Sequence, residues 1–369
     1  MIKFMDISGE IQEKERRVRR LLNRLGYDSV LITRRENFSW MSCGGRAVTS
    51  NVVHSSPVFL LVTQEKKYAI GLNMDLPRTW DEELTDQGFE PVSLPTFGKS
   101  PLQAAMELAK GRLAADDAFG GLADIEQDIL SIHEPFTQQE IERYKSVAAE
   151  SSAIIRELAD WVEPGMNERH VLAHMWGLYV EHNFDGDCMF IVSDDRIKKY
   201  RHAIPGIKKI EKVIILAPAV FKAGLHVQIS RLVTFGEPPA ETLRRFHDMA
   251  FLQAVMVAST KPGVRLNSLL KLCLDQFDNL GYPEEKINHV HGGPTGYRVS
   301  YPERCLDADE TVRPNMAFSW YLTVSGAKTE ETLLVNDRGA EIISLSNNWP
   351  TIKMAYEGAN IAVPDLLVK

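Results

Sequence analysis

The chain lacks any segment that could cross a membrane or direct secretion. Among its 369 residues no apolar run approaches the roughly 20 residues of a transmembrane helix. The first residues lack the apolar core of a signal peptide. Cysteine is scarce, and no C-x-x-C pair occurs among Cys43, Cys188, Cys273 and Cys305. This pattern favours buried thiols in a reducing compartment over disulfides or zinc, so we expect a cytoplasmic protein without a membrane partner.

Concentrated positive charge is also scarce. The formal net charge is −8 and no dense Lys/Arg tract is present, which argues against a nucleic-acid partner. One basic stretch, residues 14–20, lies on a helical pattern beside apolar residues, so we expect it to form a solvated helix face. The chain exceeds the usual size of one hydrophobic core, which predicts two domains.

The first part of the chain alternates helical and strand patterns. An amphipathic helix is predicted at about residues 10–26, a strand at 28–33 and a helix or turn at 35–42. Strands at 58–62 and 68–70 flank a charged hairpin turn, and further helices alternate with short β-rich runs. This is the pattern of a small α/β domain.

A second domain is predicted to begin at a long helix. Thr137 and Glu140 have the spacing of a capping box. We place the boundary near His133, which gives domains of residues 1–133 and 134–369. The second domain contains a faint duplication, because Pro-Gly turns at 164–165 and 262–263 each lead into a helix and then a strand. Duplicated α+β halves that share a sheet would leave a pocket at their seam.

Two distant segments carry a resemblance to a known family. Residues 224–231 are Gly-Leu-His-Val-Gln-Ile-Ser-Arg, which is similar to part of the G-Y-x-S-D-I-T-R-T-F strand pair of the creatinase, prolidase and aminopeptidase P superfamily. Residues 328–335, Lys-Thr-Glu-Glu-Thr-Leu-Leu-Val, are similar to its R-I-E-D-T-V-L-V strand. The resemblance covers nearly the whole chain and implies an α+β fold: a creatinase/prolidase-type α/β domain followed by a pita-bread domain with duplicated α+β halves.

The resemblance also implies that the family's two-metal site has been lost. Four of its five ligand positions are matched by residues that bind hard divalent cations poorly, namely Ala217, Gln228, Thr295 and Tyr321. Only the ligand Glu330 remains. The histidine ligand is open to two alignments, because anchoring on Gly296 matches it to Thr295, whereas a slip of the loop matches it to His291. Neither set would hold two ions, so we expect no metal and no other cofactor.

Two residues of the family's substrate site are present. His202 matches the histidine of the family's P-H-x-x-P segment, which contacts substrate without binding metal. Creatinase has the same fold, hydrolyses a guanidinium C–N bond without metal, and uses a histidine at the His202 position and a glutamate at the Glu330 position. A further creatinase glutamate is matched by Ser230, so creatine is not the expected substrate.

For both catalytic candidates a structural interpretation stays open. His202 is expected to act as a general acid/base, because an imidazole titrates near neutrality; otherwise it hydrogen-bonds a loop. Glu330 would orient water or bind a cationic group, or would simply pair with Lys328 or Arg231.

Polar side chains on the same segments are candidate substrate contacts. Arg201, Arg231 and Arg298 are candidate carboxylate anchors, because a guanidinium matches that group geometrically. Residues 292–296 are expected to turn tightly, either against a ligand or as a purely structural turn, and a ligand would meet the hydroxyls of Thr295 and Tyr297. The remaining candidates are Gln228, His291, Tyr321 and Lys328.

Two further pairs of side chains lie two residues apart in the sequence. His289 and His291 would share one face of a strand, and His291 is the better candidate because it adjoins the glycines. Asp185 and Asp187 are expected to be turn residues before a strand at 188–192.

These features predict a metal-independent hydrolase of a small carboxylate-bearing amide, amidine or dipeptide-like substrate, and the resemblance implies a homodimer. A catalytically inactive relative that binds a peptide or metabolite is the first alternative. A metal-dependent Xaa-Pro peptidase is the second.

Overall fold

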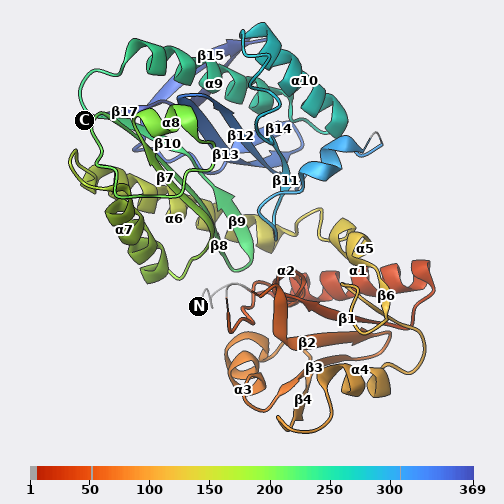
Figure 1. The fold of residues 1–369 in the computed structure, drawn as a ribbon. Helices are drawn as coiled ribbons and strands as arrows, with labels where there is room; N and C mark the ends of the chain where they lie inside the picture. Colours follow the sequence, from red (N-terminus) through yellow and green to blue (C-terminus); the bar gives the residue numbers. More distant parts are fainter. Residues whose placement is uncertain (1–5, 51–52, 308) are drawn as a thin grey trace. The chain divides into compact units, whose positions relative to one another are not determined.

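The computed structural model describes residues 6–50, 53–307 and 309–369 (Figure 1). The chain divides into two compact units, Met1–Ile141 and Glu142–Lys369. The division falls within one long helix, α6 (Gln138–Trp161). Each unit has its own sheet or sheets, so the expectation of an α+β protein with an N-terminal α/β part is confirmed.

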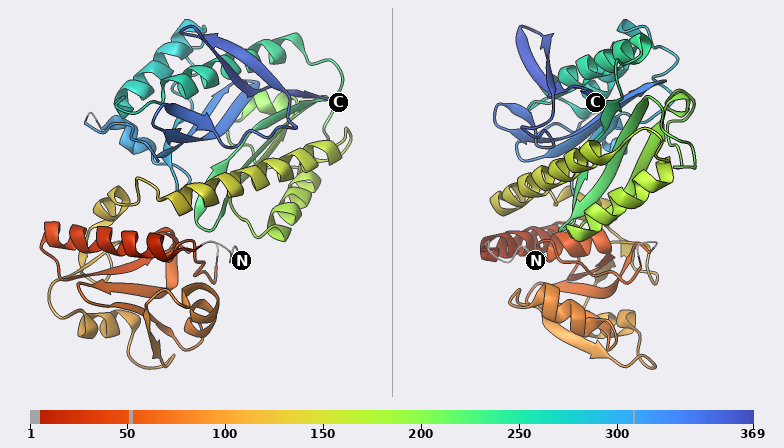
Figure 2. Two further views of the ribbon diagram at one scale, coloured as in Figure 1. Left: turned by 180° about the vertical axis from the view of Figure 1, so that it is seen from behind. Right: turned by 90° about the vertical axis from the view of Figure 1, so that its left-hand side faces the viewer.

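The first unit is built on a mixed six-stranded sheet in the order β4-β3-β2-β1-β5-β6. Helices α1 and α4 pack against this sheet, and Figure 2 shows them on its opposite sides. The pairing of β1 is antiparallel with β2 and parallel with β5. The elements in chain order are α1 (Ser8–Leu25), β1 (Ser29–Arg34), α2 (Arg35–Met41), β2 (Ser55–Thr63), β3 (Lys67–Leu72), α3 (Leu76–Thr79), a π-helical turn (Trp80–Leu84), β4 (Glu90–Leu94), α4 (Pro101–Ala109), β5 (Leu113–Ala115), β6 (Ala123–Asp124) and α5 (Glu126–Ser131).

The second unit repeats one order of elements, as the sequence predicted. Two helices are followed by antiparallel strands, first as α6, α7, β7 and β8 and then as α9, α10, β11 and β12. Thr137 and Glu140 cap α6 reciprocally: the Glu140 amide donates to the Thr137 hydroxyl at 3.2 Å, and the Thr137 amide donates to the Glu140 carboxylate at 2.8 Å. The predicted capping box is therefore confirmed.

Two sheets of this unit meet at the candidate site. One has the order β17-β10-β8-β7, with β9 paired to β8, and the other has the order β11-β12-β13-β14. A β-bridge between Ser230 and Glu330 joins them. Helix α9 packs on β12 and β13, as Figure 2 shows. The remaining bounds are α7 (Glu168–Glu181), β7 (Asp185–Ser193), α8 (Asp195–Lys199), β8 (Val213–Lys222), β9 (Leu225–Gln228), β10 (Arg231–Thr234), α9 (Ala240–Ser259), α10 (Leu266–Asn279), β11 (Gly292–Thr295), a 3₁₀ turn (Pro302–Leu306), β12 (Ala317–Val324), β13 (Ala327–Asn336), β14 (Gly339–Ile342), β15 (Thr351–Tyr356), β16 (Ala359–Pro364) and β17 (Leu367–Val368).

Two predicted turns are strands. Strand β7 already begins at Asp185, so the prediction that Asp185 and Asp187 precede the strand is wrong; a bulge between Gly186 and Cys188 explains the broken pattern. The glycine-rich segment forms β11, which pairs with β12. At Gly292 φ is 116°, and a Cβ there would overlap the backbone oxygen of Ser319. Glycine therefore allows a close approach between strands in this segment.

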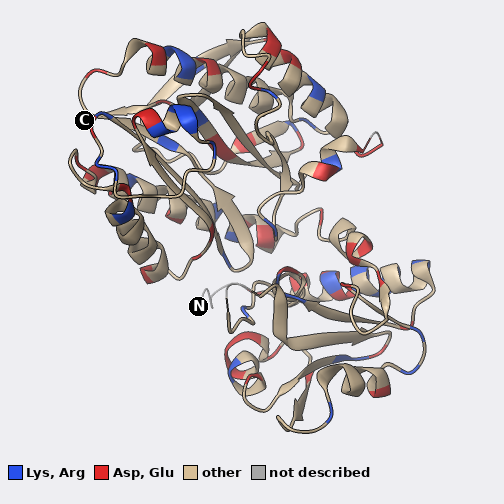
Figure 3. Cartoon of the chain, viewed as in Figure 1, with Lys and Arg blue, Asp and Glu red and all other residues tan. Residues whose placement is uncertain are grey.

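Acidic and basic residues are interspersed over the helices (Figure 3). In α1, however, the expectation that residues 14–20 are all solvated is wrong at Lys14, which is fully buried. Its ammonium lies 2.6 Å from Glu10 and 2.9 Å from Glu140, and donates to the Trp40 carbonyl at 2.6 Å. Three acceptors thus match the three N–H groups that a buried lysine must satisfy.

The described residues contain no helix long and apolar enough to span a membrane. All four cysteines are among them and none is in a disulfide, as predicted. Cys43, Cys273 and Cys305 are buried, whereas Cys188 is exposed on β7.

Candidate active site

A pair of histidines from two loops is the centre of the candidate site. His202, in the loop after α8, and His289, in the loop before β11, face each other with 3.1 Å between their Nε2 atoms. The His202 ring also stacks on Phe190 of β7, with ring centroids 5.1 Å apart and an angle of 9° between the planes. A flat apolar ring and a second imidazole thus hold His202 from two directions.

The hydrogen bonds of His289 decide which nitrogen of each ring carries the proton. His289 Nδ1 faces the Val290 carbonyl oxygen, which can only accept, so Nδ1 is the donor. In the neutral ring Nε2 is then an acceptor, and His202 Nε2–H must donate to it. His202 Nδ1 is left with a lone pair.

Both rings are neutral at pH 7. Burial lowers the pKa of His289 to about 3, and the Lys328 ammonium contributes to this decrease. Partial burial and Lys328 also lower the pKa of His202, although Glu330 opposes the change. A neutral imidazole with an available lone pair is the form that can accept a proton.

Glu330 and Lys328 lie on β13 beside this pair. The Lys328 ammonium is 2.9 Å from the Glu330 carboxylate, and both side chains are largely buried. The ammonium also lies 5.9 Å from the centre of the Phe190 ring. The structure therefore brings Glu330, Lys328 and His202 together around Phe190.

Tyr321 on β12 borders the same cluster. Its backbone is the register partner of Glu330, its ring meets His289 edge to face at 5.6 Å, and its hydroxyl hydrogen-bonds the Ser300 hydroxyl at 3.1 Å. Burial raises the pKa of Tyr321 to about 12. The phenol is therefore neutral at pH 7.

Gln228 and Thr295 use their side chains within the protein. The Gln228 amide donates to the Val299 carbonyl and lies 3.3 Å from the Thr295 hydroxyl. That hydroxyl has the Arg298 and Val299 carbonyls as acceptors, each at 2.9 Å. Ala217 lies buried on β8 and offers no side-chain donor atom. Across the described ranges, no group of three or more His, Cys, Asp or Glu side chains is placed to hold a metal ion.

The three candidate arginines contact protein groups instead. Arg201 pairs with Glu285, and Arg298 lies over the Tyr301 ring. Arg231 is buried against Glu331 and donates to the Ser344 carbonyl at 2.9 Å. Since neighbouring residues of a strand point to opposite faces, Glu331 and Arg231 lie on the face away from Glu330.

The remaining candidates lie outside the cluster. His291 is buried beside Phe277, and its Nε2 donates to the Lys286 carbonyl at 2.7 Å. Tyr297 is also buried, with its hydroxyl 3.4 Å from Arg143. The sequence favoured His291 over His289, yet His289 is the residue that contacts His202. Phe190 was not among the candidates, because the strand pattern at residues 188–192 does not distinguish a site residue from a core residue.

The profile of the metallopeptidase family M24 matches residues 142–337, more than half of the chain. The chain belongs to this family. A relative described as an uncharacterized peptidase of Staphylococcus epidermidis is 21% identical over 272 residues, which cover 70% of this chain and 77% of the relative. The M24 assignment supports a hydrolase, and more narrowly a peptidase.

Solved structures agree with the fold of this M24 chain. The prolidase of Thermococcus sibiricus matches with a TM-score of 0.76 and 17% identity over 99% of this chain and 100% of that one. An X-Pro aminopeptidase of Thermotoga maritima matches with a TM-score of 0.74 and 19% identity over 96% and 99%. The predicted creatinase/prolidase resemblance and pita-bread fold are therefore confirmed.

Proposed function

We propose that the protein hydrolyses a C–N bond of a small carboxylate-bearing amide, amidine or dipeptide-like compound without a metal ion. The observation that carries this proposal is the neutral His202–His289 pair beside Glu330 and Lys328. It supplies a proton acceptor, a carboxylate and a cation within one cluster. We also propose that the protein is a homodimer, which rests on the resemblance, and that it is cytoplasmic, which rests on the sequence composition.

The donor set supports metal independence. Two divalent ions require a cluster of deprotonated oxygen or nitrogen donors. At the matched positions, Ala217 has no donor atom, and the Gln228 amide and the Thr295 hydroxyl form hydrogen bonds within the protein. The Tyr321 phenol has a pKa of about 12. The carboxylate of Glu330 already faces the Lys328 ammonium. These residues do not fit a two-metal centre.

His202 would move the proton in both halves of the reaction. Its Nδ1 takes a proton from water as the water oxygen bonds to the substrate carbon. The resulting imidazolium keeps its Nε2–H bond to His289, which holds the ring in this orientation. His202 then returns the proton to the leaving nitrogen as the C–N bond breaks. Water is consumed and the two fragments are released, so atoms and charge balance.

Lys328 and Glu330 would divide the polar ends of the substrate. The ammonium is suited to a substrate carboxylate or to the oxygen that gains negative charge during attack. Glu330 would orient the attacking water or a cationic substrate nitrogen, and Tyr321 would offer its hydroxyl. All three cations face a glutamate, but Lys328 is the one that lies beside His202, so it is the better-placed carboxylate anchor. Roles for Gln228, Arg231, His291, Thr295, Tyr297 and Arg298 stay predictions from the sequence.

Replacement of His202 tests this proposal. We expect His202→Ala to lower kcat on dipeptides or guanidino acids about 10²- to 10⁴-fold, because a positioned acid/base contributes that much. The assay uses protein freed of metal by a chelator, and His182→Ala, on the surface beside Glu150, serves as the matched control.

Three results would redirect the proposal. Unchanged turnover in His202→Ala would remove this histidine from the mechanism. Stoichiometric metal in protein purified without chelator, together with loss of turnover on chelation, would favour the metal-dependent Xaa-Pro peptidase. Ligand binding without any hydrolysis would favour a binding protein.

A further inference from the structure

The two histidines of the site come from loops, and His202 is exposed. An exposed side chain on a loop is not fixed by core packing, so a contact of 3.1 Å between the two loops needs separate support. Neighbouring residues show where this support comes from: Arg201 precedes His202, and Glu285 lies in the loop that leads to His289.

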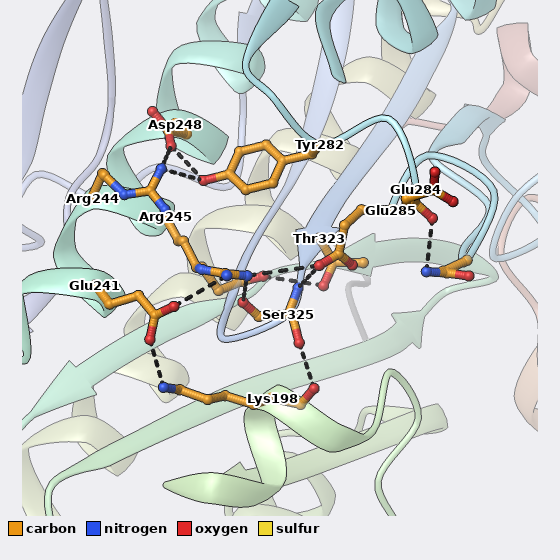
Figure 4. A network of polar contacts seen from close by, with 12 residues as sticks. Lys198, Glu241, Arg244, Arg245, Asp248, Tyr282, Glu284, Glu285, Thr323 and Ser325 are labelled. Atoms are coloured by element: carbon orange, nitrogen blue, oxygen red, sulfur yellow. Dashed lines mark hydrogen bonds and ion pairs between the residues drawn. The ribbon is translucent and has the colours of Figure 1, made fainter. Parts of the chain in front are cut away.

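Glu285 joins three segments through one carboxylate. One oxygen pairs with the Arg201 guanidinium, whose side chain is 17% exposed. The other accepts from the Ser325 amide at 3.1 Å and lies 3.7 Å from the Arg245 guanidinium. Figure 4 shows Glu285 pointing toward Arg245 and Ser325. The carboxylate thus connects the His202 loop to the β12–β13 turn and to α9.

The supports of Glu285 are themselves held by ordered elements. Arg245 donates to the Ser325 carbonyl at 2.7 Å and lies 3.1 Å from Glu241, which pairs with Lys198 at 2.7 Å (Figure 4). Lys198 belongs to α8, the helix from which the His202 loop leaves. The loop is therefore fixed at its start by Glu241 and near His202 by Glu285.

The Glu285 loop is anchored on its other side as well. The Glu285 amide donates to the Tyr282 carbonyl at 3.0 Å. The Tyr282 hydroxyl donates to Asp248 of α9 at 2.6 Å and accepts from Arg244 at 3.0 Å (Figure 4). Both ends of the connection therefore trace back to α9, a 20-residue helix packed on the sheet.

We infer that Glu285 is a positioning residue that fixes His202 at hydrogen-bond distance from His289, because it binds the Arg201 guanidinium with one oxygen and the Ser325 amide with the other. Glu285 touches neither substrate nor the reacting atoms in this scheme. Its effect on turnover rests on the proposed function, whereas its effect on the histidine contact does not.

The charge of Glu285 is the essential part. Burial lowers the pKa of Arg201, the nearby Arg245 lowers it further, and Glu285 is the group that opposes both. The Nε atom of Arg201 has no hydrogen-bond partner among the described residues. Without the carboxylate, two guanidinium groups would face each other with no anion between them, so Arg201 would move toward solvent and carry His202 with it.

The test replaces Glu285 by Gln in the full-length chain, which keeps the side-chain shape and removes the charge. The first readout is the nuclear Overhauser effect between the ring protons of His202 and His289 in histidine-labelled protein. We expect it to disappear in Glu285→Gln and to persist in Glu284→Gln, a neighbouring exposed glutamate. The second readout is kcat, which should fall about 100-fold because small misplacements of a catalytic group have effects of that size.

The outcomes separate the inference from the proposed function. A persistent ring contact in folded Glu285→Gln, or no contact in the unaltered protein, would overturn the positioning role whatever the turnover. If Glu285→Gln does not fold, Arg201→Gln removes the other half of the pair and must abolish the same ring contact. An intact contact in a protein that hydrolyses nothing would sink the proposed function and leave the role of Glu285 standing.

Discussion

The neutral state of His289 has a consequence for stability. Its pKa is about 3 in the folded chain because its ring is buried near Lys328, against an ordinary value of about 6.5 in the unfolded chain. As the pH falls below 6.5, His289 therefore becomes protonated in the unfolded chain but stays neutral in the folded chain. This contribution to stability is complete above pH 6.5 and is lost as the pH falls toward 3.

We expect the free energy of unfolding to decrease with falling pH, by at most about 1.4 kcal/mol per pH unit from this group. The measurement is urea denaturation between pH 6.5 and 4 for the unaltered chain and His289→Asn. Subtracting one free energy of unfolding from the other at each pH cancels the contribution of the carboxylates, which titrate in both proteins. A difference that stays flat over this range would contradict the assigned neutral state.

Individual site residues could be predicted from the sequence only where a motif fixed their position. His202 and Glu330 each stand within such a motif, and the structure brings them into one cluster. The sequence favoured His291 over His289 because His291 adjoins the glycines, but a spacing of two residues puts both on one face of a strand and does not show which one meets His202. The path of the loop decides it: His291 turns inward to the Lys286 carbonyl, and His289 turns toward His202.

At the scale of elements, strand β11 depends on one glycine. Gly292→Ala would place a Cβ on a backbone with a positive φ. This Cβ would overlap the Ser319 backbone oxygen and would lie 2.9 Å from Trp320 Cα. We expect a loss of about 3 kcal/mol or more in the free energy of unfolding. Gly281→Ala is the matched control, since φ there is +84° and nothing lies within 4 Å. Chemical denaturation of both variants measures the contrast, and equal losses would mean that strain alone matters.

Helix α1 depends on a buried charge that links it to the start of α6. Lys14→Met would leave Glu10 and Glu140 facing each other without a cation between them. Removing one partner from a buried ion cluster typically costs about 3–5 kcal/mol. Arg20→Met, on the exposed face of the same helix, should cost less than about 0.5 kcal/mol. Similar unfolding midpoints for the two variants would show that the cluster contributes little.

Local and distant signals account for what could be predicted about the elements. The capping box of α6 was predictable because Thr137 and Glu140 are three residues apart and need only each other. The burial of Lys14 was not, because its partner Glu140 is far away in the sequence and adjoins it only through the fold. Strand β11 was missed because its glycines mark a turn in local patterns, whereas the close approach of β12 is what requires them.

At the scale of the whole molecule, ligand binding should be visible as a higher melting temperature. A ligand at 100 times its Kd stabilises the native state by about 2.7 kcal/mol, which corresponds to about 5–10 °C for a unit of this size. We expect this shift for guanidino acids or dipeptides with a free carboxylate, measured on His202→Ala to prevent turnover. Lys328→Ala should abolish the shift and Lys353→Ala, on the exposed side of β15, should not. A shift that survives Lys328→Ala would place the carboxylate elsewhere.

The Lys328–Glu330 contact also sets the condition for engineering a metalloenzyme from this chain. Aspartates at positions 217 and 228 and a glutamate at 321 would supply carboxylates around Glu330. The ammonium of Lys328 would still lie 2.9 Å from Glu330, and because it is covalently part of the chain it would compete with a metal ion at any concentration. Any incoming divalent ion would have to displace this resident cation, so a design that restores the acids must also replace the lysine.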